Sequence, residues 1–182
     1  MHTAYLLLGS NLGNKDALLQ QAIEKLARLG TITALSQRKE TAPWGFTEDV
    51  PAFLNQALRL QTSLQPEELL AACQAVEKEL GRDRAAEAAY ASAAQEGAGS
   101  AGTGVAVAAA QHQAGASGGD GSLGKRTYSS RLIDIDILLY DRLQYRSPTL
   151  TVPHPRLRER PFAMALLQEI LPKDISLQDF YR

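Results

Sequence analysis

The chain has 182 residues and a formal net charge of −1, because 19 Lys and Arg residues almost balance 20 Asp and Glu residues. This length suits one domain with a sizeable core, and the missing basic excess argues against a general binder of nucleic acid or of membrane surfaces. The single cysteine, Cys73, excludes an internal disulfide, and the apolar N-terminal run is too short for a signal peptide or a membrane span, so we expect a cytoplasmic protein.

The N-terminal part of the chain predicts a strand followed by a helix. Residues 4–11 read as a strand that runs into a turn rich in Gly and Asn, and this turn includes Gly9 and Gly13. Apolar residues at helical spacing then predict a helix over residues 15–29, which Gly30 ends.

Two strands, a second helix and a long irregular segment follow. Residues 31–43 and 52–64 each predict a strand, and a helix begins at Pro66, where a first helical turn tolerates proline, and ends at Gly81. Residues 85–124 are dominated by Ala and Gly, a composition that buries too little apolar surface to offset its ordering entropy. We therefore predict one domain over residues 1–182, with a flexible insertion at 85–124.

The stretch "SSRLIDIDILLYD", residues 129–141, predicts a strand with two carboxylates on one face. The two-residue period puts Ile133, Ile135, Ile137 and Leu139 toward the core, and it puts on the other face Leu132, Asp134, Asp136, Leu138 and Tyr140. Two such carboxylates lie roughly 7 Å apart and repel by roughly 2 kcal/mol at an effective dielectric of about 20. Either water screens this repulsion on a half-exposed sheet, or a Mg²⁺ ion held by the carboxylates and substrate phosphates relieves it.

The C-terminal part predicts a short strand over residues 142–146 and a helix over residues 161–171. At least four strands are predicted, in adjacent pairs, with two helices among them. This order predicts an α+β sandwich of ferredoxin-like type, an antiparallel sheet with helices packed on its faces.

Cationic side chains gather near the carboxylate pair in the sequence. Arg82 and Arg84 follow the second helix, Arg131 stands three residues before Asp134, and "VPHPRLRERPF" adds His154 and several arginines. Guanidinium groups beside two carboxylates could hold a polyphosphate and its metal. Taken one at a time, each arginine is equally compatible with a solvated surface charge.

Six blocks of the sequence together resemble the 6-hydroxymethyl-7,8-dihydropterin pyrophosphokinase family, and they occur in the family's order. The blocks are "AYLLLGSNLGN", "TAPWG", "FLNQALRLQTSLQPEELL", "VEKELGRDR", "RLIDIDILLYD" and "LTVPHPRLRERPF". The resemblance covers nearly everything outside the Ala/Gly-rich segment. It implies a ferredoxin-like α+β sandwich and the transfer of pyrophosphate from ATP to the hydroxymethyl oxygen of the pterin, with release of AMP.

The resemblance also implies roles for individual residues. Asp134 and Asp136 would hold two Mg²⁺ ions that bridge the ATP phosphates, while Arg82 and Arg131 would contact the phosphates as further catalytic residues. The nucleotide site would be lined by Glu77, Arg84, Tyr128, Ile137, His154 and Arg160. The pterin would lie against Thr41, Ala42, Pro43, Trp44, Gly45, Phe53, Asn55 and Phe162, stacking on the two phenylalanines and hydrogen-bonding to the asparagine.

Two other functions stay open on the sequence. One is a different Mg²⁺-dependent nucleotidyl- or phosphotransferase on a ferredoxin-like palm, and the other is a non-catalytic nucleotide- or pterin-binding module. For the pyrophosphokinase we expect a monomer whose partners are small molecules, ATP and 6-hydroxymethyl-7,8-dihydropterin, with no nucleic-acid or membrane partner.

Overall fold

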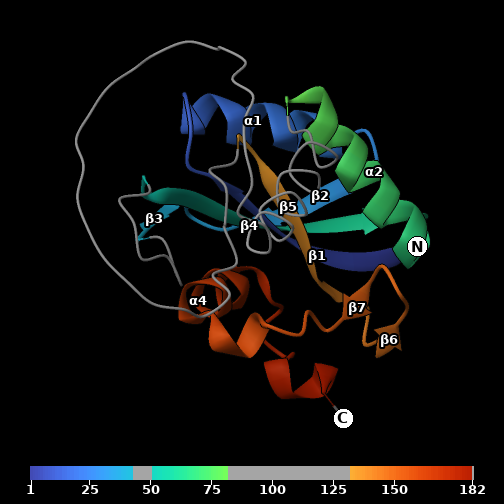
Figure 1. Ribbon diagram of the computed structural model, residues 1–182. Helices are drawn as coiled ribbons and strands as arrows, with labels where there is room; N and C mark the ends of the chain where they lie inside the picture. The colour runs from blue at the N-terminus through green and yellow to red at the C-terminus, as the bar shows by residue number, and fades with distance from the viewer. Residues whose placement is uncertain (43–50, 82–131, 182) are drawn as a thin grey trace, which may run out of the picture. The chain divides into compact units, whose positions relative to one another are not determined.

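A five-stranded antiparallel sheet organises the part of the chain that the structure describes (Figure 1). The computed structural model describes residues 1–42, 51–81 and 132–181, all within one compact unit, Met1–Asp83 with Ser130–Arg182. The strands are β1 (His2–Ser10), β2 (Thr31–Leu35), β3 (Lys39–Thr41), β4 (Phe53–Thr62) and β5 (Asp134–Tyr140). Their order is β2-β4-β1-β5, and β3 also pairs with β4. The insertion predicted at residues 85–124 lies outside the described residues.

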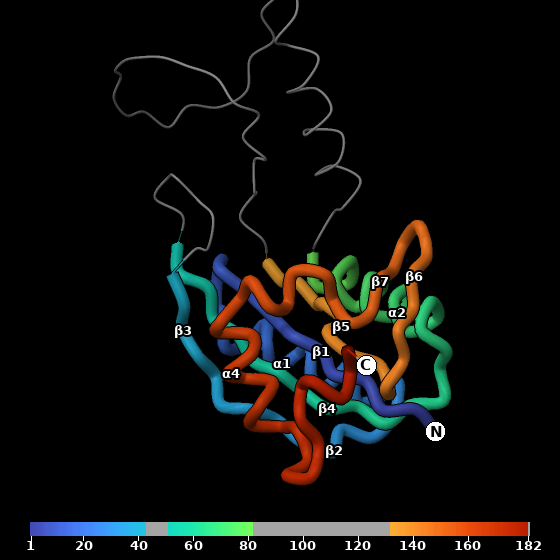
Figure 2. The backbone as a smooth tube through the Cα atoms, turned by 90° about the horizontal axis from the view of Figure 1, so that it is seen from below, coloured from blue at the N-terminus to red at the C-terminus, as the bar shows by residue number. Residues whose placement is uncertain are grey.

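Helices cover both faces of the sheet. The two on one face are α1 (Lys15–Leu26) and α2 (Pro66–Glu79), and the other face carries α4 (Pro161–Ile170), which crosses the sheet in Figure 2. Short 3₁₀ helices, η2 (Leu157–Glu159) and η3 (Leu177–Phe180), flank α4. Each face has its own buried apolar cluster, one against α1 and α2 and one against α4. The predicted α+β class, an antiparallel sheet with packed helices, is confirmed.

A β-bulge in the last sheet strand corrects the predicted faces of Leu139 and Tyr140. The register between β1 and β5 shifts between Tyr5 and Leu6, so that Tyr5 pairs with Leu139 while Leu6 pairs with Ile137. The extra residue reverses the alternation beyond it. Leu139 therefore packs on the α4 side and Tyr140 on the side of α1 and α2, contrary to strict two-residue alternation.

Predicted boundaries also differ for one helix and one strand. The helix expected over 15–29 ends at Leu26, and a Cβ atom built on Gly30 would lie 2.0 Å from the carbonyl oxygen of Gln61, so Gly30 permits close backbone approach rather than ending the helix. The strand expected over 31–43 is interrupted, because the Oγ atom of Ser36 accepts the N–H of Ala57 in place of a backbone partner.

The strand expected over 142–146 is shorter than predicted and belongs to a separate hairpin. It consists of β6 (Tyr145–Arg146), and it pairs with β7 (Thr151–Val152), a strand that the sequence interpretation missed. The hydroxyl groups of Tyr145, Ser147 and Thr149 donate to the Glu67 carboxylate, which attaches the hairpin to the first turn of α2. The hairpin leads directly to the segment that carries His154.

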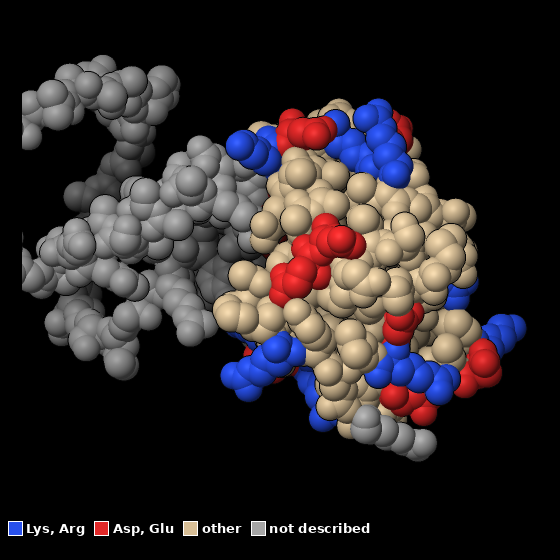
Figure 3. All heavy atoms as spheres, turned by 90° about the vertical axis from the view of Figure 1, so that its right-hand side faces the viewer, with Lys and Arg blue, Asp and Glu red and all other residues tan. Residues whose placement is uncertain are grey.

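The surface drawn in Figure 3 mixes positive and negative side chains, in keeping with a net charge of −1. The described residues of that face therefore form no continuous basic stripe of the kind that follows a nucleic-acid backbone. Among the described residues, no helix combines the length and the apolar character needed to cross a bilayer.

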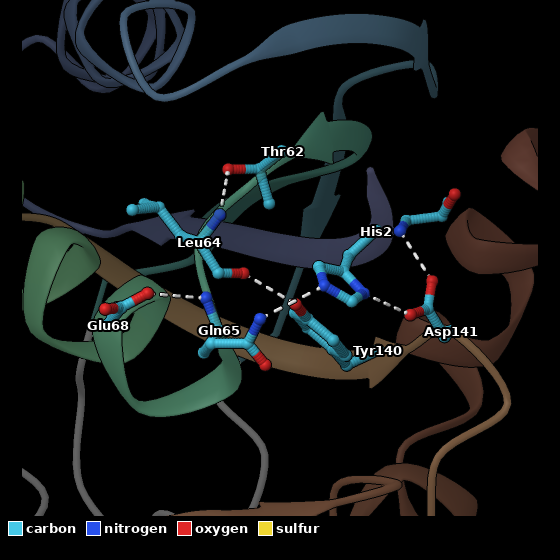
Figure 4. A network of polar contacts seen from close by, with 8 residues as sticks. His2, Thr62, Leu64, Gln65, Glu68, Tyr140 and Asp141 are labelled. Atoms are coloured by element: carbon cyan, nitrogen blue, oxygen red, sulfur yellow. Dashed lines mark hydrogen bonds and ion pairs between the residues drawn. The ribbon is translucent and has the colours of Figure 1, made fainter.

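A network of polar contacts joins the start of β1 to the end of β5 (Figure 4). The Tyr140 hydroxyl donates to the carbonyl oxygen of Leu64 at 2.6 Å, and its ring lies 5.2 Å from that of His2. Nδ1 of His2 lies 2.7 Å from Oδ2 of Asp141, whose other oxygen accepts the N–H of Thr3. Burial raises the pKa of Tyr140 to about 12, and the negative charge of Asp141 acts in the same direction.

This raised pKa predicts a loss of stability at alkaline pH. Below the unfolded-state pKa of about 10 the tyrosine is neutral in both states; as the pH rises from about 10 to 12, it ionises in the unfolded chain alone. The free energy of unfolding should therefore fall by about 2–3 kcal/mol over that range. Denaturant titrations at several pH values should show that the free energy of unfolding falls less steeply with pH in Tyr140→Phe, which retains the other tyrosines. Equal slopes for the two proteins would contradict the assignment to Tyr140.

Candidate active site

Three neighbouring strands bring Asn55, Gly9 and Asp134 into one row across the sheet. Gly9 in β1 pairs with Asn55 in β4 on one side and with Asp134 in β5 on the other. Directly paired residues share a face of the sheet, and adjacent strands lie about 4.8 Å apart. The backbones at Asn55 and Asp134 thus lie about 10 Å apart, and both side chains are on the face that α4 covers. Gly9, which lies between them, has no side chain.

The carboxylate pair lies beside the start of α4. Asp134 and Asp136 are both partly buried, and Leu7, the partner of Asp136 in β1, belongs to the α4-side cluster. Nη1 of Arg160 donates to Oδ2 of Asp136 at 2.9 Å, and 17% of the arginine side chain and 25% of the aspartate side chain are exposed. This face is therefore neither fully solvated nor closed.

The donor set suits a hard divalent cation. Burial raises the pKa of Asp136, and the negative charge of Asp134 raises it further, whereas His154 and Arg160 oppose the shift. A cation between the two carboxylates would relieve this repulsion. The described residues contain no group of three or more metal-ligating side chains. A metal here would complete its coordination with other oxygen atoms, as Mg²⁺ does with phosphates and water.

His154 lies next to the same strand. Its backbone N–H donates to the carbonyl oxygen of Leu138 at 2.8 Å, and its Nδ1 atom accepts the N–H of Arg156 at 3.2 Å. Burial lowers the pKa of His154, although the nearby Asp136 charge opposes that shift. The backbone bond fixes the histidine at the outer edge of β5, close to the carboxylate pair.

On the β4 side, a buried amide is held in one orientation. Asn55 is 4% exposed, and its Nδ2 atom donates to Oγ1 of Thr41 at 2.7 Å. A Cβ atom built on Gly9 would lie 3.0 Å from Oδ1 of Asn55 and 3.8 Å from the Phe53 ring, so a glycine suits this position, where the paired strand places both side chains close to the β1 backbone. Phe53 lies two residues before Asn55 and shares its face of the strand.

The remaining described candidates lie in different surroundings. Phe162, in the first turn of α4, is partly buried against the α4-side cluster, and Ala42 is exposed just after β3. Ile137 is buried on the opposite face of β5, among the residues that pack against α1 and α2, so its side chain does not share the face of the carboxylates. Glu77 is fully buried in α2, and its carboxylate accepts the N–H of Ile135 at 2.7 Å.

Several sequence-predicted residues lie outside the described parts of the chain. They are Arg82, Arg84, Tyr128 and Arg131 of the phosphate side and Pro43, Trp44 and Gly45 of the pterin side. Their roles stay predictions.

Two features of the site were missed from the sequence. Gly9 was assigned to a turn, yet it lies inside β1, between Asn55 and Asp134. The bond from Ile135 to Glu77 was also missed, because no sequence pattern links a helix residue to a backbone amide 58 positions away.

Comparison with known proteins gives consistent results. Residues 5–92 and 108–172 match the family model described as 7,8-dihydro-6-hydroxymethylpterin-pyrophosphokinase. A 2-amino-4-hydroxy-6-hydroxymethyldihydropteridine pyrophosphokinase of Porphyromonas gingivalis is 35% identical over 94% of this chain and 92% of its own length. Proteins of the same name from Bacillus subtilis and Methylorubrum extorquens are 34% and 33% identical, over 92% and 94% of this chain and 77% and 84% of their own lengths.

Proposed function

The chain belongs to the 7,8-dihydro-6-hydroxymethylpterin-pyrophosphokinase family, and we propose that its reaction takes place on the sheet face that carries Asn55, Asp134 and Asp136. The protein is an enzyme that transfers a pyrophosphoryl group from ATP to 6-hydroxymethyl-7,8-dihydropterin in folate biosynthesis. The oxygen of the pterin hydroxymethyl group loses its proton and forms a bond to the β-phosphorus atom, the bond from that phosphorus to the oxygen it shares with the α-phosphate breaks, and AMP leaves with that oxygen.

The row from Asn55 across Gly9 to Asp134 carries this proposal. It puts a hydrogen-bonding amide and a carboxylate pair on one face of the sheet. A single strand, β1, separates them, and its residue in this row is Gly9, which has no side chain. A flat heterocycle at Asn55 and a polyphosphate at the carboxylates could then meet above Gly9. Positioning of this kind is a main source of rate in phosphoryl transfer.

For the nucleotide side, we assign Mg²⁺, two ions by resemblance, to Asp134 and Asp136. When bound, the metal neutralises charge on the phosphate oxygens. Arg160 already lies 2.9 Å from Asp136, so its guanidinium can donate to a phosphate at the same place. His154, Arg82, Arg84 and Arg131 are proposed as further phosphate or nucleotide contacts.

For the pterin side, we assign stacking to Phe53 and Phe162 and edge recognition to Asn55. The bond from Asn55 to Thr41 holds the amide, so that Oδ1 is oriented to accept from a ring N–H. The fixed orientation lowers the entropy lost on binding. The neighbouring Ala42 and the residues Pro43, Trp44 and Gly45 are proposed to complete this side.

We further propose that the architecture is ferredoxin-like. The strand order β2-β4-β1-β5 supports this, with α1 between β1 and β2 in the sequence and α2 between β4 and β5. A cytoplasmic monomer with one domain and an insertion at residues 85–124 is proposed from composition. The family model leaves residues 93–107 of that segment unmatched, which supports the insertion.

A direct assay tests the reaction. The protein is mixed with ATP, MgCl₂ and 6-hydroxymethyl-7,8-dihydropterin, and nucleotide products are separated by ion-exchange chromatography. We expect AMP and pyrophosphorylated pterin in equal amounts, with AMP depending on the pterin. Release of ADP would indicate transfer of one phosphoryl group by a different transferase. Binding of both ligands without any AMP would favour the non-catalytic module instead.

A further inference from the structure

The outer edge of β5 needs partners that the sheet does not supply. Among the described strands, β5 pairs with β1 alone and therefore forms the edge of the sheet. Successive residues of such a strand direct their backbone N–H and C=O groups alternately toward the neighbouring strand and away from it. Outward groups that are buried must find other partners, because an unpaired buried amide is costly.

Two contacts close this edge next to the carboxylate pair. The N–H of Ile135, between Asp134 and Asp136, donates to Oε1 of Glu77 at 2.7 Å. Further along, the carbonyl oxygen of Leu138 accepts the N–H of His154 at 2.8 Å. One contact thus comes from α2 and the other from the segment before α4, and β5 is held from outside at both points.

The side chain of Glu77 is suited to this contact. It lies near the C-terminal end of α2 and is fully buried, so its carboxylate presents no surface to solvent. A carboxylate offers acceptors without donors that would need partners of their own. Hydrogen bonds to an ionised acceptor are also shorter and stronger than neutral ones.

We propose that Glu77 is a positioning residue that holds the β5 backbone so that Asp134 and Asp136 face the same metal. The hydrogen bond fixes the peptide plane between Asp134 and Ile135, and with it the direction of the Asp134 side chain and the path of the strand into Asp136. Glu77 therefore acts through the backbone of Ile135 and not as a ligand of the nucleotide. This inference rests on the proposed function in one respect, the assignment of the metal to the aspartate pair.

The test compares Glu77→Ala and Glu77→Gln with a matched control, Val76→Ala. Val76 precedes Glu77 in α2 and is 6% exposed, so its truncation weakens the packing of the same helix and removes neither partner of the hydrogen bond between Ile135 and Glu77. One readout is hydrogen exchange of the Ile135 amide in the ligand-free full chain, followed by NMR. The second is Mn²⁺ affinity in the presence of a non-hydrolysable ATP analogue, followed by electron paramagnetic resonance. The third is the Mg²⁺ concentration for half-maximal AMP release.

We expect Glu77→Ala to speed exchange at Ile135 by about 10- to 100-fold through loss of a bond to a charged acceptor. Its Mn²⁺ affinity should fall by about 10- to 100-fold, as is typical when a group that orients a metal ligand is removed. Glu77→Gln keeps an acceptor oxygen and should recover most of both properties. Val76→Ala should change neither, although it lowers thermal stability.

Two results would overturn the inference. One is a Mn²⁺ affinity of Glu77→Ala equal to that of Val76→Ala. The other is equal loss of ATP-analogue affinity in Glu77→Ala and Glu77→Gln with unchanged exchange at Ile135, which would make Glu77 a nucleotide ligand. A wild-type protein that binds Mn²⁺ and the analogue but releases no AMP would contradict the proposed reaction alone, because the first two readouts do not depend on turnover.

Discussion

Replacing Asp136 by Asn should lower AMP release by about 10³-fold or more while the protein stays folded. The substitution keeps the shape of the side chain and an oxygen that can accept from Arg160, which donates to Asp136 in this structure. It removes one of two negative charges that are proposed to hold the metal. Initial rates at saturating ATP and pterin, over a series of Mg²⁺ concentrations, measure the loss.

In the absence of Mg²⁺, the thermal stability of Asp136→Asn should not fall with its activity. The pKa of Asp136 is raised by burial and then by the charge of Asp134, so the ionised carboxylate is less favourable in the folded state than in the unfolded chain. A group of this kind destabilises the fold above its unfolded-state pKa. The melting temperature of Asp136→Asn at neutral pH should therefore equal or slightly exceed that of the wild type.

Asp174→Asn provides the control for this prediction. Asp174 is exposed and follows the C-terminal end of α4, whereas Arg160, the partner of Asp136, precedes the first turn of that helix, so the replacement removes the same charge at the other end of α4. The activity of Asp174→Asn should match the wild type. Full activity in Asp136→Asn would exclude the metal assignment. A large drop in the melting temperature of Asp136→Asn would show that the fold depends on the ion pair between Asp136 and Arg160.

The sequence predicted the features of the fold and the site that depend on the spacing of neighbouring residues. Alternation in residues 133–137 placed Asp134 and Asp136 on one strand face, and the structure places both toward α4. The prediction failed beyond Leu138, because the bulge depends on pairing with Tyr5 and Leu6, which are far away in the sequence. A single extra residue reverses the faces, and no short-range signal marks it.

Residues whose role depends on strand register could not be assigned from sequence. Gly9 and Gly30 both seemed to belong to turns or helix ends, where glycine is common. In the structure each lies against a neighbouring strand, Gly9 beside Asn55 and Gly30 beside Gln61. Such close approaches are set by tertiary pairing, so glycine alone gives no indication of its partner.

The second prediction with a large expected effect concerns the pterin side of the site. Asn55→Ala should weaken binding of 6-hydroxymethyl-7,8-dihydropterin by about 1–3 kcal/mol, because polar groups on the ring edge lose their partner. Affinity for the ATP analogue alone should hardly change, since Asn55 and Asp134 are separated by β1. Isothermal titration calorimetry with each ligand separately measures both affinities.

Gln56→Ala is the matched control for Asn55→Ala. Gln56 is the next residue of β4, a buried amide whose Nε2 atom donates to the carbonyl oxygen of Ser36. It points to the other face of the strand, so its loss should reduce stability and leave pterin affinity unchanged. Equal losses of pterin affinity in the two variants would mean that Asn55 supports the stability of the fold and does not bind the pterin.

Gly9→Ala tests the same pocket without altering any polar group. The added methyl carbon would lie 3.0 Å from Oδ1 of Asn55, so the amide, which donates to Thr41, must shift by a few tenths of an ångström. Pterin affinity should fall, by less than in Asn55→Ala, while affinity for the ATP analogue stays the same. In a chain that already carries Asn55→Ala, the methyl group has no amide to displace, and Gly9→Ala should cause little further loss. Full additivity of the two losses would mean that the methyl group acts on the ligand directly, and the proposed route through the Asn55 amide would then be wrong.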